Sequence, residues 1–206
     1  MTGVGLFILS RRWIVVVLIS AITAALVFGV GQTMYSLTPR ASYMIAVAGQ
    51  LPVIPAIAIQ ATLQAGLHQQ ESTTSRGLRR WRLAHIAVLT LIAAVFLWIA
   101  CSAAATTWTG IDPANTTAIV RNLLALVGAS LIGASLFGSL FAWTLPVAWL
   151  IVPYLLFNRA SDDPTGILTL TGQDGVAFVP FAFACGIWAI GMGLAASDVR
   201  VSHQWT

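Results

Sequence analysis

The charged residues of this chain lie in the gaps between long apolar stretches. Charged residues make up 8% of the 206 residues, and hydrophobic residues make up 58%. A soluble domain carries about 25% charged residues, so this chain has too little polar surface to cover a globule in water. The pattern therefore predicts an integral membrane protein.

Six of the apolar stretches have the length of a membrane span. A helix needs about 20 apolar residues to cross the hydrocarbon core of a bilayer. Helices are favoured over a barrel because the runs are continuously apolar, whereas the strands of a barrel alternate. The second and fifth stretches each contain two prolines, which weaken a helix. We expect an all-α membrane protein that forms a single transmembrane domain over residues 1–206, with six transmembrane helices near 13–33, 44–66, 83–106, 120–137, 141–157 and 176–197.

The positions of the arginines predict the orientation in the membrane. All ten basic residues are arginine, and an even number of spans places both termini on one side. With cytoplasmic termini, seven arginines lie inside and three, Arg40, Arg121 and Arg159, lie outside. Basic loops stay on the cytoplasmic side, so we expect a multi-pass protein of the bacterial inner membrane with both termini in the cytoplasm. The net charge of +4 then reflects topology and contact with lipid, and no nucleic-acid partner is expected.

No group of residues in the sequence has the pattern of a catalytic site. A phosphate-binding loop of the G-x-x-x-x-G-K-[ST] type needs a lysine, and the chain has none. Its three histidines, His68, His85 and His203, do not stand at metal-ligand spacing. The predicted spans also lack the acidic residues that usually carry a proton or sodium relay. We expect no enzymatic activity, no metal and no cofactor, and the energy for a transport role would come from another chain.

Arg121 is the one charge close to the interior of a predicted span. A long arginine side chain can lie along apolar surface and place its guanidinium in the interface, and we favour this snorkelling interpretation. The alternative is a contact with a partner helix or a substrate on the outer side.

Small residues recur along the fourth predicted span at intervals that allow close helix packing. We favour packing within the chain over a subunit interface for this stripe. Only two residues then interrupt the apolar run before the fifth span, which predicts a tight helical hairpin at Gly138-Ser139. The stripe consists of Gly128, Ala129, Gly133, Ala134 and Gly138.

The longest polar segment, residues 67–82, lies on the predicted cytoplasmic side. A plain basic loop explains its charge but not its length or its serine and threonine content. The stretch Glu71-Ser-Thr-Thr-Ser-Arg-Gly-Leu-Arg-Arg-Trp-Arg-Leu-Ala-His85 resembles the cytoplasmic loop of small actinobacterial ABC exporter permeases of the type-2 export class. Arg121-Asn122-Leu-Leu-Ala-Leu-Val-Gly128 and Ala142-Trp143-Thr-Leu-Pro146-Val-Ala-Trp149 resemble the fourth and fifth helices of that family.

The resemblance implies the transmembrane permease subunit of an ATP-driven exporter. Such a half-transporter pairs with a second permease subunit, identical or related, and docks on separate ABC ATPase subunits that bind ATP and Mg²⁺. Its substrate would be an antimicrobial peptide, a drug or a lipid-like molecule. The 67–82 segment would contain the coupling helix, and residues 158–175 would match a re-entrant hydrophobic piece. The residues implied at the ATPase contact are Glu71, Arg76, Arg79, Arg80 and Arg82.

Two other functions remain open at this point. A substrate-capturing subunit of an energy-coupling-factor vitamin importer has a similar size and helix number, and it docks a membrane partner through small-residue stripes such as Ala21–Ala25. The basic polar loop at 67–82 argues against it, because that loop suggests direct contact with an ATPase. A non-transport immunity or sensor protein, which would sequester a peptide at the outer surface, is the other alternative.

Overall fold

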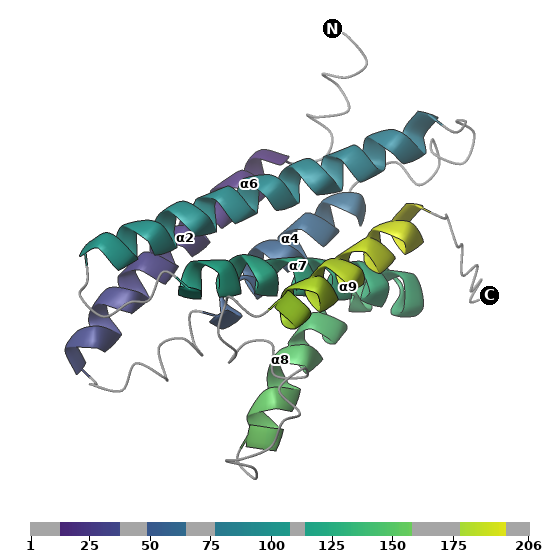
Figure 1. Ribbon diagram of the computed structural model, residues 1–206. Coiled ribbons are helices and arrows are strands. Elements are labelled where there is room, and N and C mark those ends of the chain that lie inside the picture. The colour runs from purple at the N-terminus through teal and green to yellow at the C-terminus, as the bar shows by residue number, and fades with distance from the viewer. Residues whose placement is uncertain (1–12, 38–48, 65–76, 108–113, 158–177, 197–206) are drawn as a thin grey trace, which may run out of the picture.

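The computed structural model describes residues 13–37, 49–64, 77–107, 114–157 and 178–196, and every regular element in these ranges is a helix (Figure 1). A short 3₁₀-helix, η1 (Ser139–Phe141), precedes α8. The all-α prediction is thereby confirmed for the described residues. The α-helices are α2 (Trp13–Leu37), α4 (Val53–Gln64), α6 (Gly77–Thr107), α7 (Ala114–Phe137), α8 (Thr144–Phe157) and α9 (Phe178–Ala196).

Three of these helices are long and apolar enough to cross a membrane. The apolar spans are Arg82–Thr107 in α6, Thr116–Phe137 in α7 and Phe178–Ala196 in α9. Shorter apolar stretches, Trp13–Gly29 and Val53–Leu63, lie in α2 and α4. The described part of the chain therefore has the composition and helix lengths of a membrane protein.

The second predicted span, 44–66, is interrupted in the structure. Residues 51–52 form a turn, and α4 begins only at Val53. The N–H of Ile54 donates to the carbonyl of Leu51 (3.1 Å), and the N–H of Ala56 donates to the carbonyl of Pro52 (3.2 Å). Proline has no N–H to continue a preceding helix. The 12 residues of α4 extend about 18 Å, which is shorter than the hydrocarbon core of about 30 Å.

A tight turn joins α7 to α8, as the Gly138-Ser139 interruption predicts. Gly138 has φ 80°, a conformation that side chains with a Cβ rarely adopt. Its carbonyl accepts a hydrogen bond from the N–H of Phe141 (3.3 Å) within η1. The 14 residues of α8 extend about 21 Å, so this helix begins later and is shorter than the predicted span 141–157.

α7 is the central helix of the bundle. It packs against α4, α6, α8 and α9, and 67% of its apolar span is buried, compared with 33% for α6 and 17% for α9. A continuous hydrophobic core joins α2, α4, α6 and α7, and α9 adds Trp188, Met192 and Ala195 to it. α8 leaves the bundle at a steep angle, and its far end lies away from the other helices (Figure 1).

α7 and α9 lie side by side and run in the same direction. Ala125 packs with Ala184, Gly128 faces Ile187 and Trp188, and further along Gly191 approaches Leu131. A Cβ added at Gly128 would lie 2.6 Å from the carbonyl oxygen of Ile187, and one added at Gly191 would lie 2.6 Å from the carbonyl oxygen of Gly128. The small residues let the two backbones touch.

The structure confirms packing within the chain for two members of the small-residue stripe. Gly128 contacts α9, and a Cβ at Gly133 would lie 2.7 Å from the carbonyl oxygen of Ala142, just after η1. Both glycines are therefore occupied by contacts with other parts of the same chain.

We predict that Gly128→Ala destabilises the bundle, because its new methyl group meets backbone atoms that cannot move independently. Overpacking of this kind costs about 1–3 kcal/mol. Thermal unfolding in mild detergent measures the effect, with Gly193→Ala as the matched control. Gly193 lies in α9 with nothing within 4 Å of an added Cβ, so this variant is expected to keep its stability. Equal stability of the two variants would contradict the close contact of α7 and α9.

Candidate functional site

Arg121 lies inside the apolar span of α7 and is fully buried, with a side chain that is 0% exposed. It stands five residues beyond Thr116, where the span begins, which is about 7.5 Å along the helix axis. The snorkelling interpretation is therefore wrong: the guanidinium lies within the protein rather than at its surface. The packing of α7 against α4, α6, α8 and α9 accounts for this burial.

Asn122 is the hydrogen-bonding neighbour of Arg121. Its Oδ1 accepts from both Nε and Nη2 of Arg121, each at 3.4 Å. Its Nδ2 donates to the backbone carbonyl of Gly49 at 3.2 Å. Asn122 is itself 1% exposed. The two residues thus form a buried polar cluster that connects α7 to the chain just before α4.

The interruption of the second span explains why Gly49 takes part. In a continuous helix the carbonyl of Gly49 would accept from the N–H four residues later. The turn at residues 51–52 interrupts that helix, and the Asn122 amide supplies a donor. Gly49 and Gln50 are the last helical residues before that turn, and carbonyl groups at the end of a helix need donors from outside it. The Asn122 amide therefore stabilises the interruption.

A second polar contact joins α4 to α6. Thr62 Oγ1 donates to the carbonyl of Ile59 (2.6 Å) and lies 3.2 Å from Nε2 of His85. A hydroxyl has one proton to donate, so Thr62 accepts in the second bond and His85 donates through Nε2. This histidine belongs to the stretch that resembles the exporter loop, and the structure places it inside α6.

The structure places three of the residues implied at the ATPase contact on the helix α6. Arg79, Arg80 and Arg82 lie in its first two turns, because α6 begins at Gly77 rather than at residue 83. Arginine is a good helix former, and neither glycine nor proline follows Gly77 within the helix. Glu71 and Arg76 lie outside the described residues.

The basic start of α6 extends beyond the length that a bilayer requires. The 31 residues of α6 span about 46 Å, whereas the hydrocarbon core is about 30 Å thick. The apolar span within α6 begins at Arg82. The turn that carries Arg79 and Arg80 therefore lies at the end of a continuous helix whose later part is long and apolar enough to cross a membrane.

Trp188 has a buried polar atom that the sequence did not reveal. Its indole Nε1 is buried without a hydrogen-bond partner in the part of the chain that the structure describes. Leaving a buried donor unsatisfied costs about 1–3 kcal/mol. Trp188 lies where α9 crosses Gly128, and no spacing pattern in the sequence distinguishes this tryptophan from the other seven.

The described residues contain no group of three or more histidine, cysteine or acidic side chains placed to hold a metal ion. The two cysteines are free thiols, with Cys101 buried in α6 and Cys185 partly buried in α9.

Comparison with protein-family models, with curated proteins and with solved structures finds no match to this chain.

We predict that Asn122→Leu lowers the stability of the bundle by about 1–3 kcal/mol, because it removes a buried donor and a buried acceptor at once. Asn122→Asp keeps an acceptor for Arg121 but loses the donor to Gly49. Its stability therefore reports the contribution of the bond to Gly49 separately from that of the bonds to Arg121. Unfolding in detergent measures both variants against Ser130→Ala. Ser130 is equally buried in α7, but its hydroxyl donates within the helix to Leu126 (2.9 Å). An Asn122→Leu variant as stable as Ser130→Ala would contradict the proposed role of the amide.

Proposed function

We propose that this chain is the transmembrane permease subunit of an ATP-driven exporter. It crosses the bacterial inner membrane six times with both termini in the cytoplasm, and it dimerises with an identical or related subunit to form the translocation path. A separate ABC ATPase chain binds ATP and Mg²⁺ and supplies the energy. The observation that carries the proposal is the arginine-rich first turn of α6, continuous with a helix long and apolar enough to cross the membrane.

A rigid helix of this kind suits the transmission of force from an ATPase. Residues 67–82 form the contact with the ATPase, through Glu71, Arg76, Arg79, Arg80 and Arg82. A movement of the start of α6 would pass directly into the membrane-crossing part, because no break separates the two. The charge pattern favours the cytoplasmic side for this end, where an ATPase would bind.

The two polar contacts between helices support a route from that end towards Arg121. His85 lies one turn inside the apolar part of α6 and bonds Thr62 near the end of α4. At the other end of the same segment, Gly49 bonds Asn122 beside Arg121. A shift of α6 would therefore move α4 and change the surroundings of the buried guanidinium. Arg121 is accordingly proposed as the contact for a substrate or partner helix on the outer side, and the substrate is a peptide, a drug or a lipid-like molecule.

Purification from the native host in mild detergent, followed by mass spectrometry, tests the proposal. A stoichiometric soluble ATPase, alone or with a second small helical subunit, is the expected result. Copurification with a large energy-coupling membrane subunit would instead indicate the vitamin-importer function. Isolation of the chain without partners would contradict a transport complex and favour an immunity or sensor role.

We predict that replacing Arg79 and Arg80 together with alanine weakens binding of the ATPase by about tenfold. An exposed ion pair contributes up to about 1 kcal/mol, and 1.4 kcal/mol corresponds to a tenfold change. ATP hydrolysis would become uncoupled from export, while membrane insertion remains normal. Arg200→Ala is the matched control, because it removes an arginine from the predicted cytoplasmic side outside this segment. Normal export by the double variant would exclude the proposed coupling role.

We also predict that Thr62→Val reduces coupling, because valine keeps the shape of threonine but cannot accept the hydrogen bond from His85. One such bond contributes about 0.5–1.5 kcal/mol, so export per ATP hydrolysed is expected to fall by up to about tenfold. Thr90→Val is the control: Thr90 is also buried, but its hydroxyl donates within α6 to Ile86 (2.8 Å). Equal coupling in the two variants would show that the contact between α4 and α6 transmits nothing.

A further inference from the structure

Five large apolar side chains are exposed around the turn between α7 and α8. Their exposed fractions lie between 48% and 74%, with Leu140 the most exposed. Contiguous exposed apolar surface marks a site that contacts lipid or another protein. This turn patch consists of Leu136, Phe137, Leu140, Phe141 and Trp143.

The chain around the turn patch carries no charge that would hold it in water. No charged residue lies between Arg121 and Arg159, so the run continues uncharged through α7, the turn and α8. A helical hairpin that emerged into the cytoplasm would usually show basic residues at its tip. Here the tip is Gly138-Ser139, and space around Gly138 is open, with nothing within 4 Å of an added Cβ.

The length of α7 places the turn at or inside the membrane boundary. From Thr116 to Phe137 the apolar span of α7 extends about 32 Å. A typical tilt of about 20° shortens its projection on the membrane normal to about 30 Å, which matches the thickness of the hydrocarbon core of about 30 Å. With Thr116 at one boundary of the hydrocarbon core, Phe137 therefore reaches the other boundary, and the turn begins there rather than beyond the lipid head groups.

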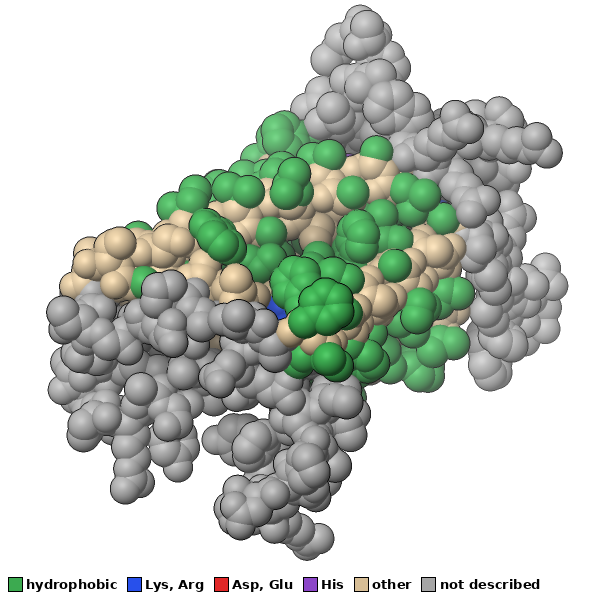
Figure 2. Space-filling view, viewed as in Figure 1, with side chains coloured by type: hydrophobic (Ala, Val, Ile, Leu, Met, Phe, Trp, Pro, Cys, Tyr) green, Lys and Arg blue, Asp and Glu red, His purple; other side chains and the backbone are tan. Residues whose placement is uncertain are grey.

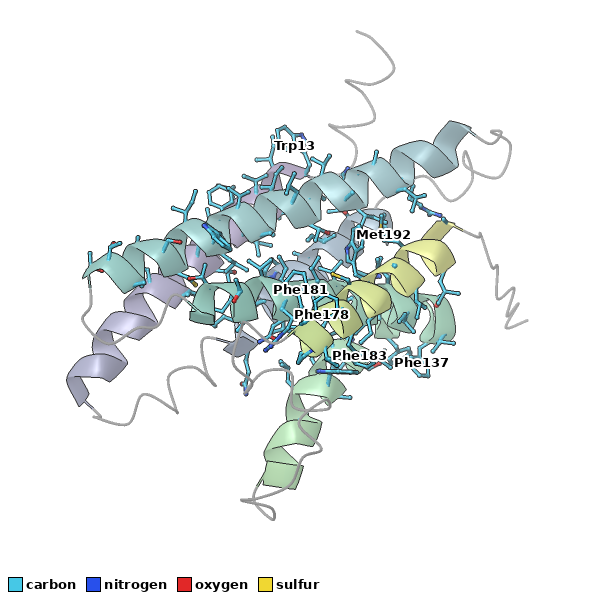
Figure 3. All side chains as sticks on the ribbon, in the orientation of Figure 1. Trp13, Phe137, Phe178, Phe181, Phe183 and Met192 are labelled. Atoms are coloured by element: carbon cyan, nitrogen blue, oxygen red, sulfur yellow. The ribbon has the colours of Figure 1, made fainter. Side chains whose placement is uncertain are left out.

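The side chains of the turn patch fit lipid better than a second copy of the chain. Helices associate in membranes through small residues that bring backbones together, and the patch holds leucine and aromatic side chains instead. The small residues Gly128, Gly133 and Gly191 are already occupied by contacts within the chain. Figure 3 shows Phe137 at the end of α7 on the outside of the bundle, directed away from α4 and α6, whereas Met192 lies between α9 and the core.

We propose that the α7–η1–α8 turn is embedded in the cytoplasmic leaflet, where lipid acyl chains cover the turn patch. α8 then begins within the bilayer rather than in water. Hydrophobic side chains also cover the described part of one face of the bundle (Figure 2). That face would contact lipid in the same way as the turn patch. The proposal rests on the membrane placement of the chain and not on export. A turn covered by lipid cannot contact a soluble ATPase. The connection between predicted spans that can make this contact is then residues 67–82.

A spin label at Leu140 tests the proposal. The Leu140→Cys variant, in a background with Cys101→Ala and Cys185→Ala, is labelled with a nitroxide and placed in phosphatidylethanolamine–phosphatidylglycerol vesicles. Power saturation then compares collisions with oxygen, which concentrates in hydrocarbon, and with a water-soluble nickel complex. A label at Ile190, an exposed side chain within the span of α9, is the reference for lipid contact. A second label at Phe141 covers the case in which Leu140→Cys does not fold.

The expected result is high oxygen access and low nickel access at Leu140 or Phe141, close to the values at Ile190. High nickel access at the turn but not at Ile190 would place the turn in water and overturn this proposal alone. Low access to both reagents at the turn would mean that protein covers it, which also overturns the proposal. High nickel access at Ile190 as well would contradict the membrane placement itself.

Discussion

The close contact between α7 and α9 organises the rest of the bundle. At Gly128 and Gly191 the two backbones approach until an added Cβ would meet a carbonyl oxygen at 2.6 Å in either direction. In lipid such a contact is stabilised by van der Waals packing, because apolar tails remove the hydrophobic driving force between helices. Since α7 and α9 run in the same direction, the chain between them must return across the thickness that both helices occupy. That return begins with η1 and α8, so the parallel pair constrains the direction of the chain after α7.

Polar groups within this apolar interior divide into two kinds. Most buried hydroxyl groups donate to a carbonyl four residues earlier in the same helix, as Ser20 does to Val16 and Thr90 to Ile86, both at 2.8 Å. These bonds satisfy the hydroxyl within its own helix, so it needs no hydrogen-bond partner on a neighbouring helix. The bonds from Asn122 to Gly49 and from His85 to Thr62 instead join different helices. They hold the short segment around α4 at both ends, at Gly49 and at Thr62, so this segment connects the first part of α6 to the surroundings of Arg121.

The sequence predicted the helices well and the environment of single residues poorly. Long apolar runs identify α2, α6, α7 and α9 because their composition suffices. The prolines correctly mark the second stretch as irregular, since Pro52 lies in the turn before α4. In the fifth stretch α8 continues through Pro146 and Pro153, and the turn and η1 before it delay its start. The snorkelling interpretation of Arg121 was wrong because burial depends on which helices surround α7, and the pattern of one helix does not contain that information. The early start of α6 is not predicted by the apolar run, because residues 77–82 carry three arginines, which interrupt an apolar run but favour a helix. Trp188 gave no signal at all, because its unsatisfied indole nitrogen results from packing against a neighbouring helix.

The arrangement of α7 and α9 as parallel crossings is the central claim, and the sidedness of their starting ends tests it most directly. Single cysteines at Thr109, before α7, and at Gln173, before α9, would be labelled in intact cells with a membrane-impermeant maleimide, after replacement of Cys101 and Cys185. Both positions are expected to react from outside, whereas a cysteine at Ser75 reacts only after the membrane is permeabilised. Labelling of Thr109 and Gln173 from opposite sides would contradict the parallel pair and the six-crossing scheme built on it.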